Sequence, residues 1–181
     1  MQFNVAQFLK ESPGASRRYD LLADVSFIEE EVKAVRPLSG SVEFMRSSGG
    51  ILVTGQLETE VEVVCSRCLE PFLLPIKVKL EEEFRPTVDV VTGAKLKKTA
   101  SGVSISDEDK ATLIDEHHVL DLSEVVRQDI LLAIPMRPLC RPNCAGICPH
   151  CGHNLNEGPC GCRDEAIDPR WAVLERLKDI S

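Results

Sequence analysis

The chain has few aromatic residues, no long apolar run and no excess of positive charge, and each shortage makes a class of function less plausible. Aromatic residues make up 4% of the 181 residues, so recognition of nucleic acid by base stacking is not indicated. No apolar run approaches the ~20 residues that a membrane-spanning helix needs. Because the formal net charge is −8, the chain gains little from bulk attraction to phosphate, and any RNA contact has to be local or bridged by a basic protein.

Motifs of several enzyme classes are also missing. The sequence contains no Gly-rich phosphate loop and no nucleophile elbow. Its first residues, MQFNVAQFLKESPG, have no basic segment followed by an apolar stretch, so we expect no secretory signal and a cytoplasmic location. Thiols in that compartment are kept reduced, which favours metal binding over disulfides.

Cysteine is the residue that stands out. The chain has eight cysteines; two form a Cys-x-x-Cys and six crowd one later stretch. Thiolates two residues apart on a tight turn can bind the same ion, and tetrahedral Zn²⁺ takes four such ligands. Eight thiols would fill two structural sites with none left over, and no position would stay open for a reacting water. The predicted zinc ligands are Cys65, Cys68, Cys140, Cys144, Cys148, Cys151, Cys160 and Cys162.

The spacing favours one partition of these thiols. The segment Cys148-Pro-His-Cys151-Gly resembles a zinc knuckle, and Cys160-Gly-Cys162 supplies two more sulfurs eight residues later, so these four form a self-contained site. The second site would then clip Cys65 and Cys68 to the segment after the central helix, closing a loop of roughly seventy residues. Two alternatives stay open: a single metal, or a partition with Cys140, Cys144, Cys148 and Cys151 in one site and the remaining four in the other.

Four histidines accompany this pattern without being needed by it. His150 and His153 are interleaved with the thiols, and His117 and His118 end a polar segment. Four local thiols suffice for a metal, so we interpret the first pair as surface or supporting residues and the second as solvated.

Alternating apolar and polar residues predict an antiparallel meander from Leu38 to Phe84. The Cys65–Cys68 motif lies between two of its strands. Because both apolar faces of a hairpin must lie on the same side, odd residues of the first strand pair with even residues of the second. We therefore expect Val63 to face Phe72 and Glu58 to face Lys77.

Helical patterns flank this meander. We expect a short helix around residues 5–9, a helix from Asp121 to Ile134 that starts with a capping box of Asp121 and Glu124, and a last helix at residues 168–179. Residues 85–118 show no period and are predicted to form a long mobile loop. The fold class is α+β: an antiparallel meander packed with a few helices in residues 1–135, and a small Cys-rich zinc-binding module with the C-terminal helix in residues 136–181, packed on the same domain.

These motifs together resemble the YceD/DUF177 family of bacterial and plastid proteins. The matching pieces are Cys65-Ser-Arg-Cys68-Leu-Glu-Pro71, the helix with its Asp-Leu-Ser-Glu start, the run from Cys140 to Asn156 that ends in Asn-Leu-Asn, and Asp-Pro-Arg-Trp-Ala-Val-Leu near the end. The resemblance implies a cytoplasmic role in making or accumulating large-subunit ribosomal RNA, without a defined enzymatic activity.

Three functional hypotheses follow. The first is a non-enzymatic ribosome-biogenesis factor for 23S ribosomal RNA on a zinc-stapled scaffold. Its partners would be precursor rRNA, a ribosomal protein, or both, and it would have no small-molecule substrate. The arginines near the thiols that could contact phosphate are Arg67, Arg137, Arg141 and Arg163. The second is an acidic adaptor or chaperone for a basic ribosomal protein, using the glutamates of the meander. The third is a metal-dependent RNA-processing enzyme, although the sequence shows neither an open metal site nor an acid–base pair that such an enzyme would need.

Overall fold

The computed structural model describes residues 1–25, 32–96 and 110–162, and the chain divides into two compact units. The first unit is Met1–Ser66 with Glu70–Cys140, and the second is Arg67–Leu69 with Arg141–Ser181. The predicted boundary at residue 135 and the packing of its two sides on each other stay predictions. The predicted last helix at residues 168–179 lies outside the described residues, as do residues 26–31 and 97–109.

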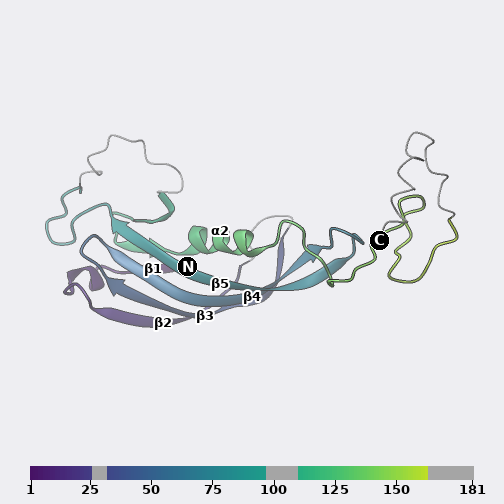
Figure 1. The fold of residues 1–181 in the computed structure, drawn as a ribbon. Coiled ribbons are helices and arrows are strands. Elements are labelled where there is room, and N and C mark those ends of the chain that lie inside the picture. Colours follow the sequence, from purple (N-terminus) through teal and green to yellow (C-terminus); the bar gives the residue numbers. More distant parts are fainter. Residues whose placement is uncertain (26–31, 97–109, 163–181) are drawn as a thin grey trace, which may run out of the picture. The chain divides into compact units, whose positions relative to one another are not determined.

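In its described residues the first unit has a five-stranded sheet, a two-stranded sheet and the α-helix α2 (Figure 1). Its elements in chain order are β1 (Gln2–Asn4), the 3₁₀ turn η1 (Phe8–Lys10), β2 (Ser16–Ala23), β3 (Lys33–Arg46), β4 (Ile51–Val64), β5 (Pro71–Pro86), β6 (Leu113–Ile114), β7 (Val119–Asp121) and α2 (Ser123–Ala133). The large sheet has the order β2-β3-β4-β5-β6, with β6 parallel to β5 and the other neighbours antiparallel. The predicted α+β meander is confirmed.

The β4–β5 hairpin has the predicted register. Val63 pairs with Phe72, and Glu58 pairs with Lys77, whose Nζ lies 2.9 Å from a Glu58 carboxylate oxygen. One face of β4 is buried through its odd residues, because the strand period of two puts them all on the side that packs on the core. The hairpin therefore carries residues 65–70 at its tip, between the end of β4 and the start of β5.

The core lies between the large sheet and α2, which packs against β5 (Figure 1). The helix contributes Val125, Val126 and Ile130, all buried in the same apolar cluster as the inward residues of β3, β4 and β5. Ala133, whose helical spacing from Val126 and Ile130 predicts that it shares their apolar stripe, is exposed. Strands β3 and β4 approach closely at Gly40, whose φ is +154° and where an added Cβ would lie 2.1 Å from the Gln56 carbonyl oxygen.

The predicted capping box at the start of α2 is wrong. Asp121 ends β7, and Leu122 occupies the cap position with no side-chain cap bond. Glu124 instead accepts a hydrogen bond from Arg127 at 2.8 Å and one from Gln128 at 2.9 Å. Asp121 accepts the Ser123 backbone N–H but no bond links it to Glu124 as in a capping box, and its other hydrogen bonds come from Met1 and Gln2, across a strand pairing that local sequence does not reveal.

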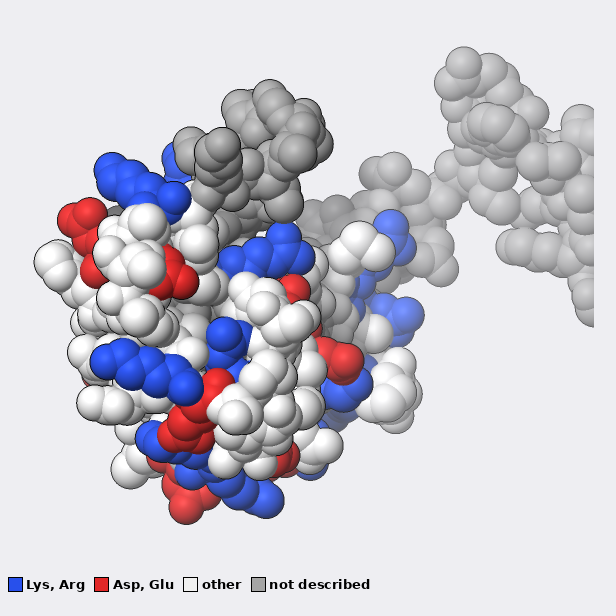
Figure 2. Space-filling view, turned by 90° about the vertical axis from the view of Figure 1, so that its left-hand side faces the viewer, with Lys and Arg blue, Asp and Glu red and all other residues white. Residues whose placement is uncertain are grey.

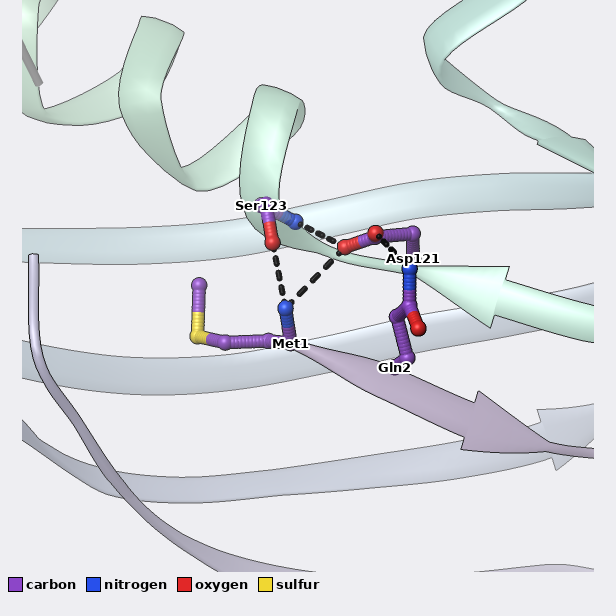
Figure 3. Close-up of polar contacts among 4 residues, drawn as sticks. All are labelled: Met1, Gln2, Asp121 and Ser123. Carbon is purple, nitrogen blue, oxygen red and sulfur yellow. Dashed lines mark hydrogen bonds and ion pairs between the residues drawn. The ribbon is translucent and has the colours of Figure 1, made fainter. Parts of the chain in front are cut away.

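Asp121 collects donors from three directions (Figure 3). Its carboxylate accepts bonds from the Met1 amino group at 3.1 Å, Gln2 Nε2 at 2.9 Å and the Ser123 backbone N–H at 2.8 Å. The Met1 amino group also donates to the Ser123 hydroxyl. Burial raises the pKa of Asp121, but the hydrogen bonds from Ser123, Gln2 and Met1 outweigh it, so that this pKa lies well below its usual range.

Two further expectations need correction. The helix expected around residues 5–9 is the single 3₁₀ turn η1, although Phe8 and Leu9 are buried as their spacing predicts. The expected loop of residues 85–118 is not free of structure in its described parts: β5 extends into it, Val88 bridges to Lys95, and Leu113–Ile114 forms β6. Its apolar residues are too few to produce a visible period, but they complete the edge of the sheet.

Candidate metal centres

The eight thiols form two groups of four. In each group the ligand atoms all lie within 4.8 Å of one another. The hairpin group is Cys65, Cys68, Cys140 and Cys144. The local group is Cys148, Cys151, Cys160 and Cys162. None of the eight is in a disulfide.

This spacing fits a tetrahedral ion. Sulfurs bound to zinc at about 2.3 Å in tetrahedral geometry lie about 3.8 Å from each other. Four thiolates are a donor set typical of structural zinc, in which no position is left for water. The grouping is also the one that the sequence spacing favoured, whereas binding of metal by these residues stays a prediction.

The local group is built on a tight turn. The Cys148 backbone N–H donates to the His153 carbonyl oxygen at 2.8 Å, and the Gly152 N–H donates to the Cys148 carbonyl at 2.9 Å. Gly152 has a φ of +73°, in the left-handed region that glycine enters without a steric penalty. The turn brings the backbone N–H groups of His150 and Cys151 toward the sulfur of Cys148.

Those N–H groups change the acidity of the thiols. Hydrogen bonds from the backbone of Cys151 and His150, and then from the Cys160 thiol, lower the pKa of Cys148 to about 6. Cys162 has the opposite shift: its pKa rises to about 12, chiefly because it hydrogen-bonds the Cys151 sulfur, with smaller contributions from partial desolvation and from Cys148. Four thiols this close cannot all ionise without a cation, and a divalent metal would supply the missing positive charge.

The hairpin tip has the same backbone pattern as the local turn. The Cys65 N–H donates to the Glu70 carbonyl at 2.9 Å, five residues on, as Cys148 does to His153. Leu69 occupies the position of Gly152 and has a φ of +60°, one of two non-glycine residues with positive φ in the described chain. The neighbouring Ser66 N–H donates to the Pro138 carbonyl at 2.8 Å. Both Cys-x-x-Cys motifs are therefore knuckles of the same type.

Cys144 is held by a network that the sequence did not reveal. Its sulfur accepts a hydrogen bond from Asn156 Nδ2 at 3.4 Å, and its carbonyl accepts one from Arg67 Nη1 at 2.9 Å. Asn156 Oδ1 accepts the Ala145 N–H at 2.8 Å. Asn156 stands in the Asn-Leu-Asn run that carried the family resemblance, which was the one available signal. Arg67, considered as a phosphate contact, is thus engaged with the Cys144 backbone.

The structure places the four histidines in different surroundings. His150 is exposed and His153 is half-buried, and no metal-ligand group among the described residues includes either. His117 is exposed, but the Nδ1 of His118 is buried without a hydrogen-bond partner, so the expectation that both are solvated is wrong for His118. Of the other arginines considered near the thiols, Arg137 and Arg141 are exposed, and Arg163 lies outside the described residues.

Fold and thiols define a class of protein: a β-sheet scaffold with two four-thiol groups suited to structural metals. Residues 53–178 match the family described as "Large ribosomal RNA subunit accumulation protein YceD". The chain belongs to this family, as its motifs indicated.

Curated relatives agree with this assignment. An uncharacterized protein of Mycobacterium tuberculosis is 35% identical over 130 residues, covering 72% of this chain and 56% of the relative. A protein of Zea mays named "Large ribosomal RNA subunit accumulation protein YCED homolog 1, chloroplastic" is 30% identical over 149 residues, covering 72% of this chain and 50% of the relative. The homologue of the same name in Arabidopsis thaliana is 27% identical over 157 residues, covering 79% and 49%.

The chain spans about half the length of the curated relatives that it matches. No solved structure matches it significantly. Within the described residues, α2 and η1 are each too short to cross a membrane.

Proposed function

We propose that this chain is a non-enzymatic ribosome-biogenesis factor, needed for the synthesis, processing or accumulation of large-subunit (23S) ribosomal RNA. The family match over residues 53–178 carries this proposal, and the printed names of the maize and Arabidopsis relatives support it. The same proposal includes a cytoplasmic location, although the plant relatives are named as chloroplastic.

Zinc at both thiol groups is the structural part of the proposal. The hairpin group and the local group would each hold one ion through four thiolates, and the ion would supply positive charge and fix the two knuckles. The donor set and the backbone N–H groups aimed at Cys148 support zinc as a scaffold element. A site in which four thiolates fill the coordination shell has no place for substrate, which is why we propose no enzymatic step.

The mixed surface charge favours local contacts with a partner over long-range attraction by a large patch of one sign. On the face in Figure 2, Lys and Arg side chains are interspersed with Asp and Glu, and the coloured surface shows no continuous patch of one sign. Such a face has little long-range attraction for RNA or for a basic protein.

The adaptor alternative loses part of its electrostatic basis. It relied on a row of glutamates along β4 and on those at the end of β5. Glu58 is paired with Lys77 at 2.9 Å, and Glu60 with Arg36 at 3.1 Å. Glu81 is paired with Lys79 at 2.8 Å. A carboxylate that already has a basic neighbour attracts a basic partner less strongly.

Depletion in the host organism tests the proposed function. We expect lower 23S rRNA and fewer large subunits in a sedimentation profile, with restoration by the wild-type gene. Unchanged rRNA and subunit levels would refute the role. Recovery of partners on the tagged full-length protein, with and without nuclease, separates the routes: partners lost on nuclease treatment indicate RNA contact, and retained ribosomal proteins indicate the adaptor.

A separate measurement tests the zinc scaffold. Elemental analysis of the purified protein should find two zinc equivalents, and one after Cys151→Ser or after Cys65→Ser. No bound zinc with titratable thiols would refute the scaffold while leaving the ribosomal role to be decided by depletion.

A further inference from the structure

Asn156 is the residue through which the two thiol groups can influence each other. It lies outside both groups, yet its amide donates to Cys144 Sγ at 3.4 Å, and Cys144 belongs to the hairpin group. Its neighbours in sequence belong to the knuckle of the local group. The Asn156 side chain thus contacts a ligand of the hairpin group, while its backbone lies between Cys151 and Cys160, two ligands of the local group.

The orientation of the Asn156 amide follows from its partners. The Ala145 backbone N–H donates to Oδ1 at 2.8 Å, so Oδ1 must face Ala145. Nδ2 is left to donate, to Cys144 Sγ and to Asn154 Oδ1 at 2.7 Å. An N–H donor placed on a thiolate stabilises its negative charge and orients it, as supporting hydrogen bonds do at protein metal sites.

The local knuckle holds Asn156 in this position. Ile147 and Asn154 form an antiparallel bridge, and the Leu155 N–H donates to the Gly146 carbonyl at 2.9 Å. The Asn156 N–H donates to Asn154 Oδ1 at 3.1 Å. These bonds tie residues 153–156 to the segment that carries Cys148, so the position of Asn156 depends on the knuckle being closed.

Because closing the knuckle is what a metal at the local group would do, we propose that metal binding at the local group raises the metal affinity of the hairpin group, with Asn156 as the positioning residue that transmits the effect. The inference rests on the proposed zinc scaffold. Coupling of this kind is reciprocal, so metal at the hairpin group would raise the affinity of the local group by the same factor.

The test compares the metal affinity of the hairpin group in the wild-type chain and in a set of variants of the full chain. Co²⁺ is titrated and followed by its thiolate charge-transfer absorption, and Zn²⁺ affinity is obtained by chelator competition. Asn156→Asp keeps an acceptor for the Ala145 N–H but replaces the donor on Cys144 by a carboxylate. Cys151→Ser removes the local site. The matched control is Asn143→Asp, the same change on an exposed asparagine adjacent to Cys144 in sequence.

We expect Asn156→Asp and Cys151→Ser each to weaken the hairpin group by about 10- to 100-fold, the usual loss when a supporting hydrogen bond is removed. The double variant should lose little more than either single variant, because both changes break the same link. Asn143→Asp should stay within about threefold of wild type, which measures the effect of the added charge alone. Asn156→Ser, whose hydroxyl can still donate, should be intermediate, and it takes the place of the Asp variant if that variant fails to fold.

Three results overturn the inference. If Cys151→Ser leaves the hairpin affinity unchanged while both groups bind metal, the groups are independent, and the zinc scaffold survives without the coupling. If Asn156→Asp and Asn143→Asp weaken the hairpin group equally, charge and not the Asn156 bond is responsible. If wild type binds no metal, the coupling and the scaffold both fail.

Discussion

The two knuckles carry different residues at the position that has a left-handed backbone, and substitutions at these two positions should change stability in opposite directions. Leu69 and Gly152 have similar left-handed backbones, with φ of +60° and +73°. A non-glycine residue pays about 1–2 kcal/mol in this region, whereas a glycine costs about 0.5–1 kcal/mol through the freedom of the unfolded chain. Leu69→Gly should therefore stabilise its knuckle by up to about 1 kcal/mol, and Gly152→Ala should destabilise the local knuckle by about 1 kcal/mol.

Side-chain contacts do not obscure this comparison. The Leu69 side chain is 59% exposed, so its removal forfeits little burial. A Cβ added at Gly152 would meet no heavy atom within 4 Å, so the cost of alanine there is that of the backbone alone. Gly161 is the matched control, because it lies between two thiols of the same group, has open space at its Cβ and has no left-handed φ.

Urea unfolding of the zinc-saturated protein measures the effect of Leu69→Gly, and chelator competition measures that of Gly152→Ala. A loss of about 1 kcal/mol corresponds to roughly fivefold weaker zinc binding at the local group. Gly161→Ala should change neither quantity by more than about 0.5 kcal/mol. The reasoning is refuted if Leu69→Gly lowers the free energy of unfolding by about 1 kcal/mol or more, since the left-handed strain would then be absent.

Two further predictions concern the sheet and the β1–β7 pair. Gly40→Ala should lower the free energy of unfolding by about 2–4 kcal/mol, because its Cβ would lie 2.1 Å from the Gln56 carbonyl oxygen; a loss below about 0.5 kcal/mol in urea unfolding would contradict the close approach of β3 and β4. Asp121 has a folded-state pKa below its ordinary value. Its contribution to the free energy of unfolding is therefore complete above about pH 4 and is lost as pH falls through the folded-state pKa. Asp121→Asn should lower the free energy of unfolding by under about 1 kcal/mol at pH 7, after allowance for the exposure of Asp121, and this difference from wild type should become smaller below about pH 4. A difference in the free energy of unfolding that grows on acidification would contradict the lowered pKa.

The register of the β4–β5 hairpin was predictable because one physical rule decides it. Apolar residues alternate in both strands, and burying both faces on one side leaves a single parity for the pairing. The rule needs only local pattern, and it placed Val63 opposite Phe72 and Glu58 opposite Lys77. The grouping of the thiols followed in the same way from spacing, since the four latest cysteines can close on one ion without help from the rest of the chain.

Features that depend on distant partners were missed for a common reason. β1 and β7 have three residues each and pair across more than a hundred positions, so neither has a period of its own. Asp121 had the local signature of a helix cap, but the donors of Met1 and Gln2 recruit it for the strand pair. Local preference is a weak prior when a tertiary contact offers more hydrogen bonds.

Asn156 is a residue at which this limit of prediction from local sequence affects the proposed metal sites. Among the ligands of the hairpin group, Cys65 directly follows β4 and has a backbone bond across the tip. Cys144 has no helix or strand to hold it, and its position depends on a turn bond to Arg141 and on Asn156 and Arg67. A hydrogen bond to a charged group contributes about 1.5–3 kcal/mol, which is roughly 10- to 100-fold in affinity. Cys144 is therefore a ligand outside the sheet whose order the local knuckle can influence, and in the proposed coupling a single asparagine makes the two thiol groups interdependent.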